Sequence, residues 1–246
     1  MRLKVIACDV LRREAGYLAA RSDCYVDVTY LPQGLHEEPD RLRETVQEQI
    51  RIAESGFPYN HFGLRPDYDY IVLAYGLCSN GTLGLVNEKI PLVVPRAHDC
   101  ITLLLGSKAE YSRIFSERPG TYWYSRGWIE CSLQPGKERY TNVYREYEEK
   151  YGEDNAEYLM EMEQSWFTKY NRAVFIDWPG LNDSESYRNY TKECAEYLKW
   201  NYDEIMGDPG LLARVLNGIF DGNEVLIVPP GGKIAATYGE DIIKLE

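Results

Sequence analysis

Four residues that bind soft metals follow three short apolar runs of the sequence. The runs have the character of buried strands and are Val5–Ala7, Ile71–Ala74 and Pro91–Val94. Cys8 follows the first run, Cys78 the second, and both His98 and Cys100 the third. If the strands are parallel neighbours, their loops share one edge of the sheet, which is where open α/β folds place their binding sites. The spacing therefore predicts that these residues form a single site.

Thiolate and imidazole side chains at one edge indicate a metal centre. Both are good ligands for Zn²⁺, and thiolates also hold iron–sulfur clusters. We expect Cys8, Cys78 and Cys100 to be the metal ligands. His98 is then a fourth ligand, an acid/base group, or a histidine with only a structural role. The alternative is that Cys8 and Cys78 are small buried apolar residues at strand ends, a role that free cysteine often has.

Charged residues flank the histidine of the third loop. Arg96 could bind an anionic substrate, because a guanidinium forms bidentate hydrogen bonds with carboxylates and phosphates. Asp99 could orient His98, since a carboxylate fixes the tautomer of a neighbouring imidazole. His98, Arg96 and Asp99 are therefore the candidate catalytic residues. An ordinary structural ion pair is the alternative role for Arg96 and Asp99.

The loop that contains Cys78 is rich in glycine, which lets the backbone approach a metal or cofactor closely. Gly76, Asn80 and Gly81 are its candidate cofactor-binding residues. His36 could reach the same edge from the loop after the strand Tyr25–Tyr30. The alternative is that it is an exposed turn residue. The glycine loop lacks both the lysine of a P-loop and the spacing of a dinucleotide-binding motif, so the sequence does not indicate a nucleotide enzyme.

The three other cysteines do not fit this site. Cys24 precedes a strand and should face the opposite end of the sheet, and Cys194 lies on a predicted helix, so both are expected to be structural. Cys131 is a poor extra ligand. The sequence starts on a strand pattern without the apolar region of a signal peptide, which predicts a cytoplasmic protein with free or metal-bound thiols.

Composition excludes two classes of partner. The 246 residues carry a formal net charge of −12, with a pI of about 4.9. A nucleic-acid groove or an anionic membrane surface requires clustered lysine and arginine, so neither is an expected partner. No apolar run approaches the roughly 20 residues that cross a bilayer. The length suits one substantial hydrophobic core.

Strand and helix patterns alternate along the chain. The six expected strands are Leu3–Ala7, Tyr25–Tyr30, Tyr70–Ala74, Pro91–Val94, Ala173–Ile176 and Asn223–Val228. Thr121–Trp123 could add a short strand, and Ser184–Met206 is predicted as one long helix. This alternation favours an α/β fold with a doubly wound, mainly parallel sheet and flanking helices. We expect residues 1–246 to form a single domain, with a more irregular, acidic helical segment at about 120–170.

The candidate site residues also carry a resemblance to a known family. The matching motifs are Ile6-Ala-Cys8, Leu35-His36, Tyr75-Gly-Leu-Cys78, Pro95-Arg-Ala-His-Asp-Cys100 and Gly127-Trp128. With these motifs the chain resembles the domain-of-unknown-function family numbered 1638, which is found largely in anaerobic bacteria and methanogens. The resemblance covers most of the chain. Because such proteins often occur near corrinoid methyl-transfer systems, it implies one-carbon metabolism as the setting without assigning an activity.

Two classes of function fit these residues. In the first, a zinc ion or a [4Fe–4S] cluster serves a transferase or an accessory enzyme of methyl, sulfur or corrinoid-linked one-carbon metabolism. Its substrate would be a small molecule or a corrinoid, and a methyltransferase or corrinoid protein would be its partner. In the second class, the protein is a non-catalytic carrier that binds a metal or a corrinoid and delivers it to a partner.

Overall fold

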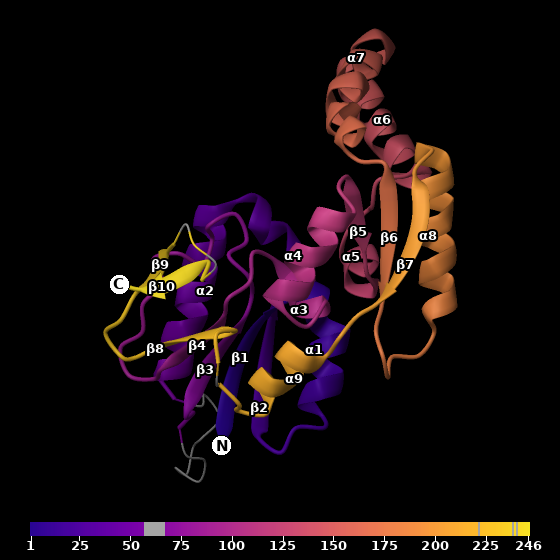
Figure 1. The fold of residues 1–246 in the computed structure, drawn as a ribbon. Helices are drawn as coiled ribbons and strands as arrows, with labels where there is room; N and C mark the ends of the chain where they lie inside the picture. Colours follow the sequence, from indigo (N-terminus) through magenta and orange to yellow (C-terminus); the bar gives the residue numbers. More distant parts are fainter. Residues whose placement is uncertain (57–66, 221, 238, 240) are drawn as a thin grey trace. The chain divides into compact units, whose positions relative to one another are not determined.

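The computed structural model describes residues 1–56, 67–220, 222–237, 239 and 241–246 (Figure 1). Contacts divide the chain into two compact units. The first unit comprises Met1–Tyr111 and Gly207–Glu246, and the second comprises Ser112–Met206. Each unit has its own parallel strands. The single domain expected over residues 1–246 stays a prediction. In the described part of the chain, no helix is both long enough and apolar enough to cross a membrane.

A five-stranded sheet forms the centre of the first unit. Its strands, in spatial order, are β2 (Tyr25–Leu31), β1 (Arg2–Cys8), β3 (Tyr70–Ala74), β4 (Leu92–Pro95) and β8 (Val225–Val228). The first four are parallel, and β8 pairs with β4 in the antiparallel sense. A short antiparallel pair, β9 (Ile234–Ala236) and β10 (Ile243–Leu245), follows β8. The α/β fold with mostly parallel strands that the sequence predicts is confirmed.

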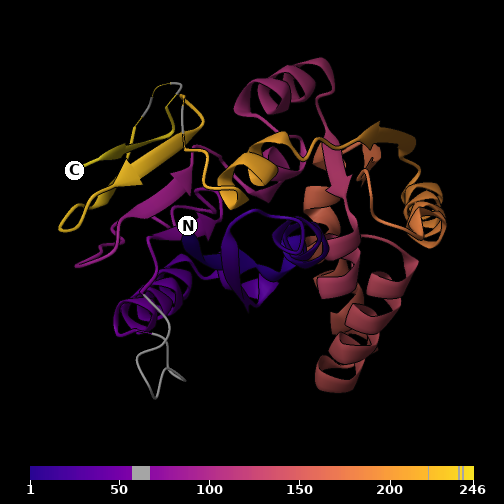
Figure 2. The same ribbon diagram turned by 90° about the horizontal axis from the view of Figure 1, so that it is seen from below.

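The order of strands reverses beside β1. β2 lies on one side of β1 and β3 on the other, so the crossover helices α1 (Arg12–Ala19) and α2 (Pro39–Glu54) cover opposite faces of the sheet. Figure 2 shows α2 on one face and, on the other, α1 packed beside α9 (Gly210–Leu216). Such a reversal opens a crevice beyond the carboxyl ends of the two strands that flank it, here β1 and β3.

Helical periodicity explains how α2 covers the sheet. Leu42, Val46, Ile50 and Ala53 recur at helical spacing along it and are all buried. Proline at its first turn suits a helix start, because proline lacks the N–H that would have no partner there. The remaining helical segments of this part of the chain are η1 (Asp9–Leu11), η2 (Gln33–Glu37), α3 (Cys100–Leu104) and α4 (Lys108–Glu117), which leads into the second unit.

The second unit has a three-stranded parallel sheet, β5 (Thr121–Tyr124), β6 (Arg172–Asp177) and β7 (Asn201–Met206). Its helices are α5 (Arg126–Cys131), α6 (Lys137–Tyr151), α7 (Glu153–Gln164), η3 (Ser165–Lys169) and α8 (Ser184–Leu198). α6 and α7 pack on each other and extend away from the sheet (Figure 1), and α6 buries none of its residues. The acidic helical segment expected near residues 120–170 corresponds mainly to this pair.

The long helix predicted over Ser184–Met206 is wrong in its last third. α8 ends at Leu198 because Lys199 adopts a left-handed conformation (φ 59°), which stops the helix. The following residues form β7, where pairing with β6 satisfies the backbone hydrogen bonds that the helix would have supplied. The short strand expected at Thr121–Trp123 is confirmed as β5.

Candidate functional site

Three cysteines lie beyond the carboxyl ends of three adjacent parallel strands. Cys8 is the last residue of β1, Cys78 follows β3 after a three-residue loop, and Cys100 is the first residue of α3, which follows β4. β1, β3 and β4 are neighbours in the sheet, so the three residues share its carboxyl edge. Cys8 and Cys100 are buried, with 8% and 7% of their surfaces exposed, and Cys78 is half-buried.

Backbone hydrogen bonds tie the loop of Cys78 to the loop of Cys100. The Leu77 amide donates to the Ala97 carbonyl (2.8 Å), and the Cys78 amide donates to the His98 carbonyl (3.0 Å). These bonds continue the β3–β4 pairing past the ends of both strands. Gly76 makes the close approach possible, because a Cβ at this position would lie 2.5 Å from the Asp99 nitrogen.

Replacing Gly76 by alanine should therefore separate the two loops. The new methyl group would also lie 2.6 Å from the Asp99 Cα, so the backbone must shift, and we expect a loss of about 1–3 kcal/mol in the free energy of unfolding. Urea denaturation measures this loss. Gly34→Ala is the matched control in the same unit, because a Cβ at Gly34 meets nothing within 4 Å. Equal stability of the two variants would contradict the close approach.

The loop holds Cys78 in an unusual conformation. Cys78, Ser79 and Asn80 all have positive φ angles of 45°, 56° and 69°. A left-handed conformation costs roughly 1–2 kcal/mol for a residue with a side chain. Arg43 of α2 stabilises this turn, since its guanidinium donates to the carbonyls of Leu83 (2.6 Å) and Asn80 (3.3 Å). Strained backbone that the surrounding structure maintains is frequent at functional sites.

Tyr75 is a buried tyrosine at the same edge of the sheet as the three cysteines. Tyr75 follows β3 directly and is 2% exposed, and a hydrogen bond between its side chain and Cys8 lowers the pKa of that thiol against the larger effect of burial. Burial raises the pKa of Tyr75, and so do the negative charges that Cys8, Cys78 and Cys100 would carry as thiolates. All three sulfurs are therefore close enough to influence this one hydroxyl.

Burial disfavours the thiolate form of Cys8 and Cys78. It raises the pKa of Cys8 to about 11, and the negative charge of Asp9 adds to this effect. Burial likewise raises the pKa of Cys78 to about 12, with a contribution from the nearby thiol of Cys8. No basic side chain is among the groups that shift the pKa of Cys8 or Cys78. A bound cation would supply the positive charge that their thiolates need.

Backbone amides counteract part of the effect of burial on Cys8 and Cys78. The backbone N–H groups of Val10 and Asp9 stabilise the thiolate of Cys8, and that of Gly76 stabilises the thiolate of Cys78. Hydrogen bonds from the backbone to sulfur also tune the potential of protein-bound iron–sulfur clusters. No three or more His, Cys, Asp or Glu side chains of the described residues are already arranged to hold a metal. A metal centre made of Cys8, Cys78 and Cys100 stays a prediction.

The three residues predicted to be catalytic have different environments. His98 is exposed, and its ring centroid lies 6.2 Å from that of Tyr111. Asp99 caps α3 by accepting from the amides of Ile101 (3.0 Å) and Thr102 (3.4 Å).

The partners of Arg96 lie beside and within β10. Arg96 donates to two backbone carbonyls. One is that of Asp241 (2.9 Å), just before β10, and the other is that of Ile243, the first residue of β10. Its guanidinium also forms an ion pair with the Asp241 carboxylate (3.6 Å), which is the structural role that the sequence left open as the alternative for Arg96. A catalytic role for Arg96 stays a prediction.

The predicted cofactor-binding residues also differ in position. Gly81 packs under α2, where a Cβ would lie 2.5 Å from Leu42, and Asn80 is exposed at the turn. His36 lies in η2, with its Nδ1 2.5 Å from the Gln33 carbonyl. Gly76 and Gly81 thus shape the loop that carries Cys78, and ligand contacts by Asn80 and His36 stay predictions.

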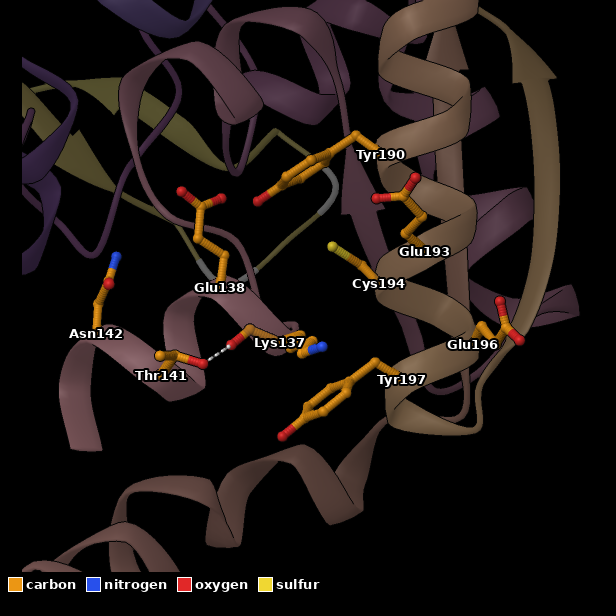
Figure 3. A pocket seen from close by; sticks show the side chains of 9 residues that line it. All are labelled: Lys137, Glu138, Thr141, Asn142, Tyr190, Glu193, Cys194, Glu196 and Tyr197. Atoms are coloured by element: carbon orange, nitrogen blue, oxygen red, sulfur yellow. Dashed lines mark hydrogen bonds between the residues drawn. The ribbon is translucent and has the colours of Figure 1, made fainter. Parts of the chain in front are cut away.

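A cavity of about 610 Å³ lies elsewhere, between α6 and α8 of the second unit. Figure 3 shows the sulfur of Cys194 directed into it from α8, between Tyr190 and Tyr197. Burial raises the pKa of Cys194 to about 11, and a Cβ on Gly136 would lie 2.7 Å from its sulfur. Cys194 is thus a closely packed, protonated thiol.

A buried ion pair in the second unit was not predicted from the sequence. Arg126, which is 1% exposed at the start of α5, pairs with Asp177 at the end of β6 (2.9 Å). Burial alone would raise the pKa of Asp177, but a hydrogen bond from Ser184 and the charge of Arg126 outweigh it and lower that pKa. The 51 residues that separate the partners explain why no local pattern reveals the pair.

The fold and the cysteines define an α/β protein with a thiol-rich carboxyl edge. The chain belongs to the family described as "Protein of unknown function (DUF1638)", whose model matches residues 30–216. That range contains Cys78 and Cys100 and begins after Cys8. No curated protein and no solved structure matches the chain.

Proposed function

We propose that this protein binds a zinc ion or a [4Fe–4S] cluster through Cys8, Cys78 and Cys100. In this proposal the centre serves methyl or sulfur transfer, or an accessory step, in corrinoid-linked one-carbon metabolism. One observation supports the metal site: Cys8, Cys78 and Cys100 share the carboxyl edge of the neighbouring strands β1, β3 and β4. The crevice where strand order reverses, between β1 and β3, supports the same location.

The electrostatics of the edge favour a cation of this kind. Three thiols that bind a divalent metal release three protons and form a centre with one net negative charge. The amides of Val10 and Gly76 favour the thiolates of Cys8 and Cys78. Three protein ligands leave one position of a tetrahedral zinc, or one iron of a cluster, open to a sulfur or methyl-bearing substrate.

A non-catalytic carrier of a metal or a corrinoid is the second candidate. The observation in its favour is that Asp99 caps α3 and Arg96 binds backbone carbonyls near β10, so both polar groups already have structural partners. In the transferase, His98 would be the acid/base group or fourth ligand at the loop surface. In the carrier, the open position of the centre would bind the cargo or the partner's ligand.

Anaerobic purification followed by metal analysis and visible spectroscopy tests the metal site. We expect either about one zinc per chain without colour, or about four irons with a broad absorption in the blue region. Sharp corrinoid bands with a stoichiometric metal would favour the carrier. A protein that contains none of these, and takes up neither zinc nor iron and sulfide after anaerobic reduction, would overturn the proposal.

A further inference from the structure

The cavity between α6 and α8 of the second unit lies where α6 leaves α8. Gly136, directly before α6, approaches α8 so closely that a Cβ on it would lie 2.7 Å from the Cys194 sulfur. From there α6 runs away from α8 (Figure 3), and it buries none of its residues. The space that remains between the two helices is about 610 Å³, which is a size that holds a small organic molecule.

One face of α8 lines the cavity with two aromatic rings. Tyr190, Cys194 and Tyr197 recur at helical spacing, so they share one face of the helix. Figure 3 shows the rings of Tyr190 and Tyr197 on either side of the Cys194 sulfur. Tyr197 is 40% exposed, so its ring offers apolar contact surface to a ligand.

The charged residues that line the cavity are mainly acidic. Glu138 of α6 and both Glu193 and Glu196 of α8 supply carboxylates, and Lys137 supplies an ammonium group. None of these carboxylates forms an ion pair with another residue that the structure describes. Figure 3 shows Glu138 and Glu193 extending from the two helices on opposite sides of the cavity. Burial raises the pKa of Cys194, and the negative charges of Glu193 and Glu138 add to that effect. The cavity thus combines an excess of negative charge with aromatic walls.

We propose that this cavity binds an organic cation, which consists of an ammonium group on an apolar body. The carboxylates of Glu138 and Glu193 attract the ammonium group. The rings of Tyr190 and Tyr197 cover the apolar body, and the electron-rich face of a tyrosine also attracts a cation. A metal ion would leave both rings uncovered, so the aromatic walls favour an organic ligand. This inference goes beyond the proposed function and does not rest on a metal at the cysteines of the first unit.

Three compounds that share an apolar body and differ in charge test this inference on the full chain. Phenethylammonium carries a positive charge, phenethyl alcohol carries none, and hydrocinnamate carries a negative charge. We expect phenethylammonium to bind about tenfold more tightly than the alcohol, because hydrogen bonds to charged groups contribute more than those between neutral groups. Hydrocinnamate should not bind. Isothermal titration calorimetry measures the dissociation constants. Equal binding of the ammonium compound and the alcohol, or no binding of the ammonium compound, would overturn the proposal.

Glu193→Gln and Glu149→Gln separate the cavity from the general attraction of an acidic chain. Each variant removes one negative charge from a protein of net charge −12, but Glu149 is an exposed residue of α6 that does not line the cavity. In Glu193→Gln, we expect the dissociation constant for phenethylammonium to rise about fivefold, as for the loss of one close charge pair. The Glu149→Gln protein should bind as the wild type does, and circular dichroism checks the fold of both. If the two variants change the dissociation constant equally, the net charge attracts the cation and the cavity is not its site.

Discussion

Replacing Cys100 by serine should remove most of the bound metal and leave the fold intact. The loss is large because a neutral hydroxyl is a poor substitute for a coordinating thiolate. The fold should persist, since serine has nearly the volume of cysteine and Cys100 lies at the first position of the short helix α3, whose cap is Asp99. Metal content after anaerobic purification measures the effect, and circular dichroism checks the fold. Cys8→Ser and Cys78→Ser should behave alike.

Cys194→Ser and Cys24→Ser are the controls for this experiment. Cys194 lies in α8 of the second unit and Cys24 precedes β2, at the end of the sheet opposite Cys8. Both variants should keep the metal content of the wild type. If the Cys8, Cys78 and Cys100 variants also keep it, the protein does not bind the metal through these thiols.

Replacing Arg126 by methionine should destabilise the protein by about 3–5 kcal/mol. Arg126 is 1% exposed and pairs with Asp177, so its loss leaves a buried carboxylate without one of its two arginine partners. Methionine retains most of the side-chain volume, which limits the effect of an empty cavity. Urea denaturation followed by tryptophan fluorescence measures the free energy of unfolding.

Arg113→Met is the matched control for the buried pair. Arg113 pairs with Glu117 one turn along α4, and both side chains are about half exposed. Exposed pairs at this spacing contribute about 0.3–0.5 kcal/mol, so the control should be nearly as stable as the wild type. A loss below about 1 kcal/mol for Arg126→Met would show that the protein compensates for the buried charge in another way.

Apolar runs followed by cysteines were enough to predict the edge of the first sheet. Val5–Ala7 and Ile71–Ala74 are continuous buried runs, as parallel strands covered on both faces require, and their ends fixed the positions of Cys8 and Cys78. The family resemblance is confirmed by the match over residues 30–216, which contains the motifs of Cys78 and Cys100. The division into two units was not predicted, because strands and helices alternate in both and no linker separates them.

Contacts between distant residues explain what the sequence could not reveal. Tyr75 looks like an ordinary strand-end aromatic, and only the β1–β3 register, in which Ala7 pairs with Ala74, brings it to the end of β1 where Cys8 lies. Arg96 and Asp99 flank His98 in sequence, yet one binds carbonyls near β10 and the other caps α3. Adjacency in sequence does not determine such partners, because the direction of each side chain depends on the loop conformation.

X-ray absorption at the metal edge tests the central claim most directly, because it reports the atoms bound to the metal in the intact protein. For a zinc-loaded sample we predict about three sulfur ligands at about 2.3 Å. An iron-loaded sample should show sulfur as the dominant neighbour of every iron, as in a cluster. In Cys100→Ser protein reloaded with zinc, the sulfur count should fall by about one. A metal surrounded only by nitrogen and oxygen, or a sulfur count unchanged by that substitution, would contradict a centre built from Cys8, Cys78 and Cys100.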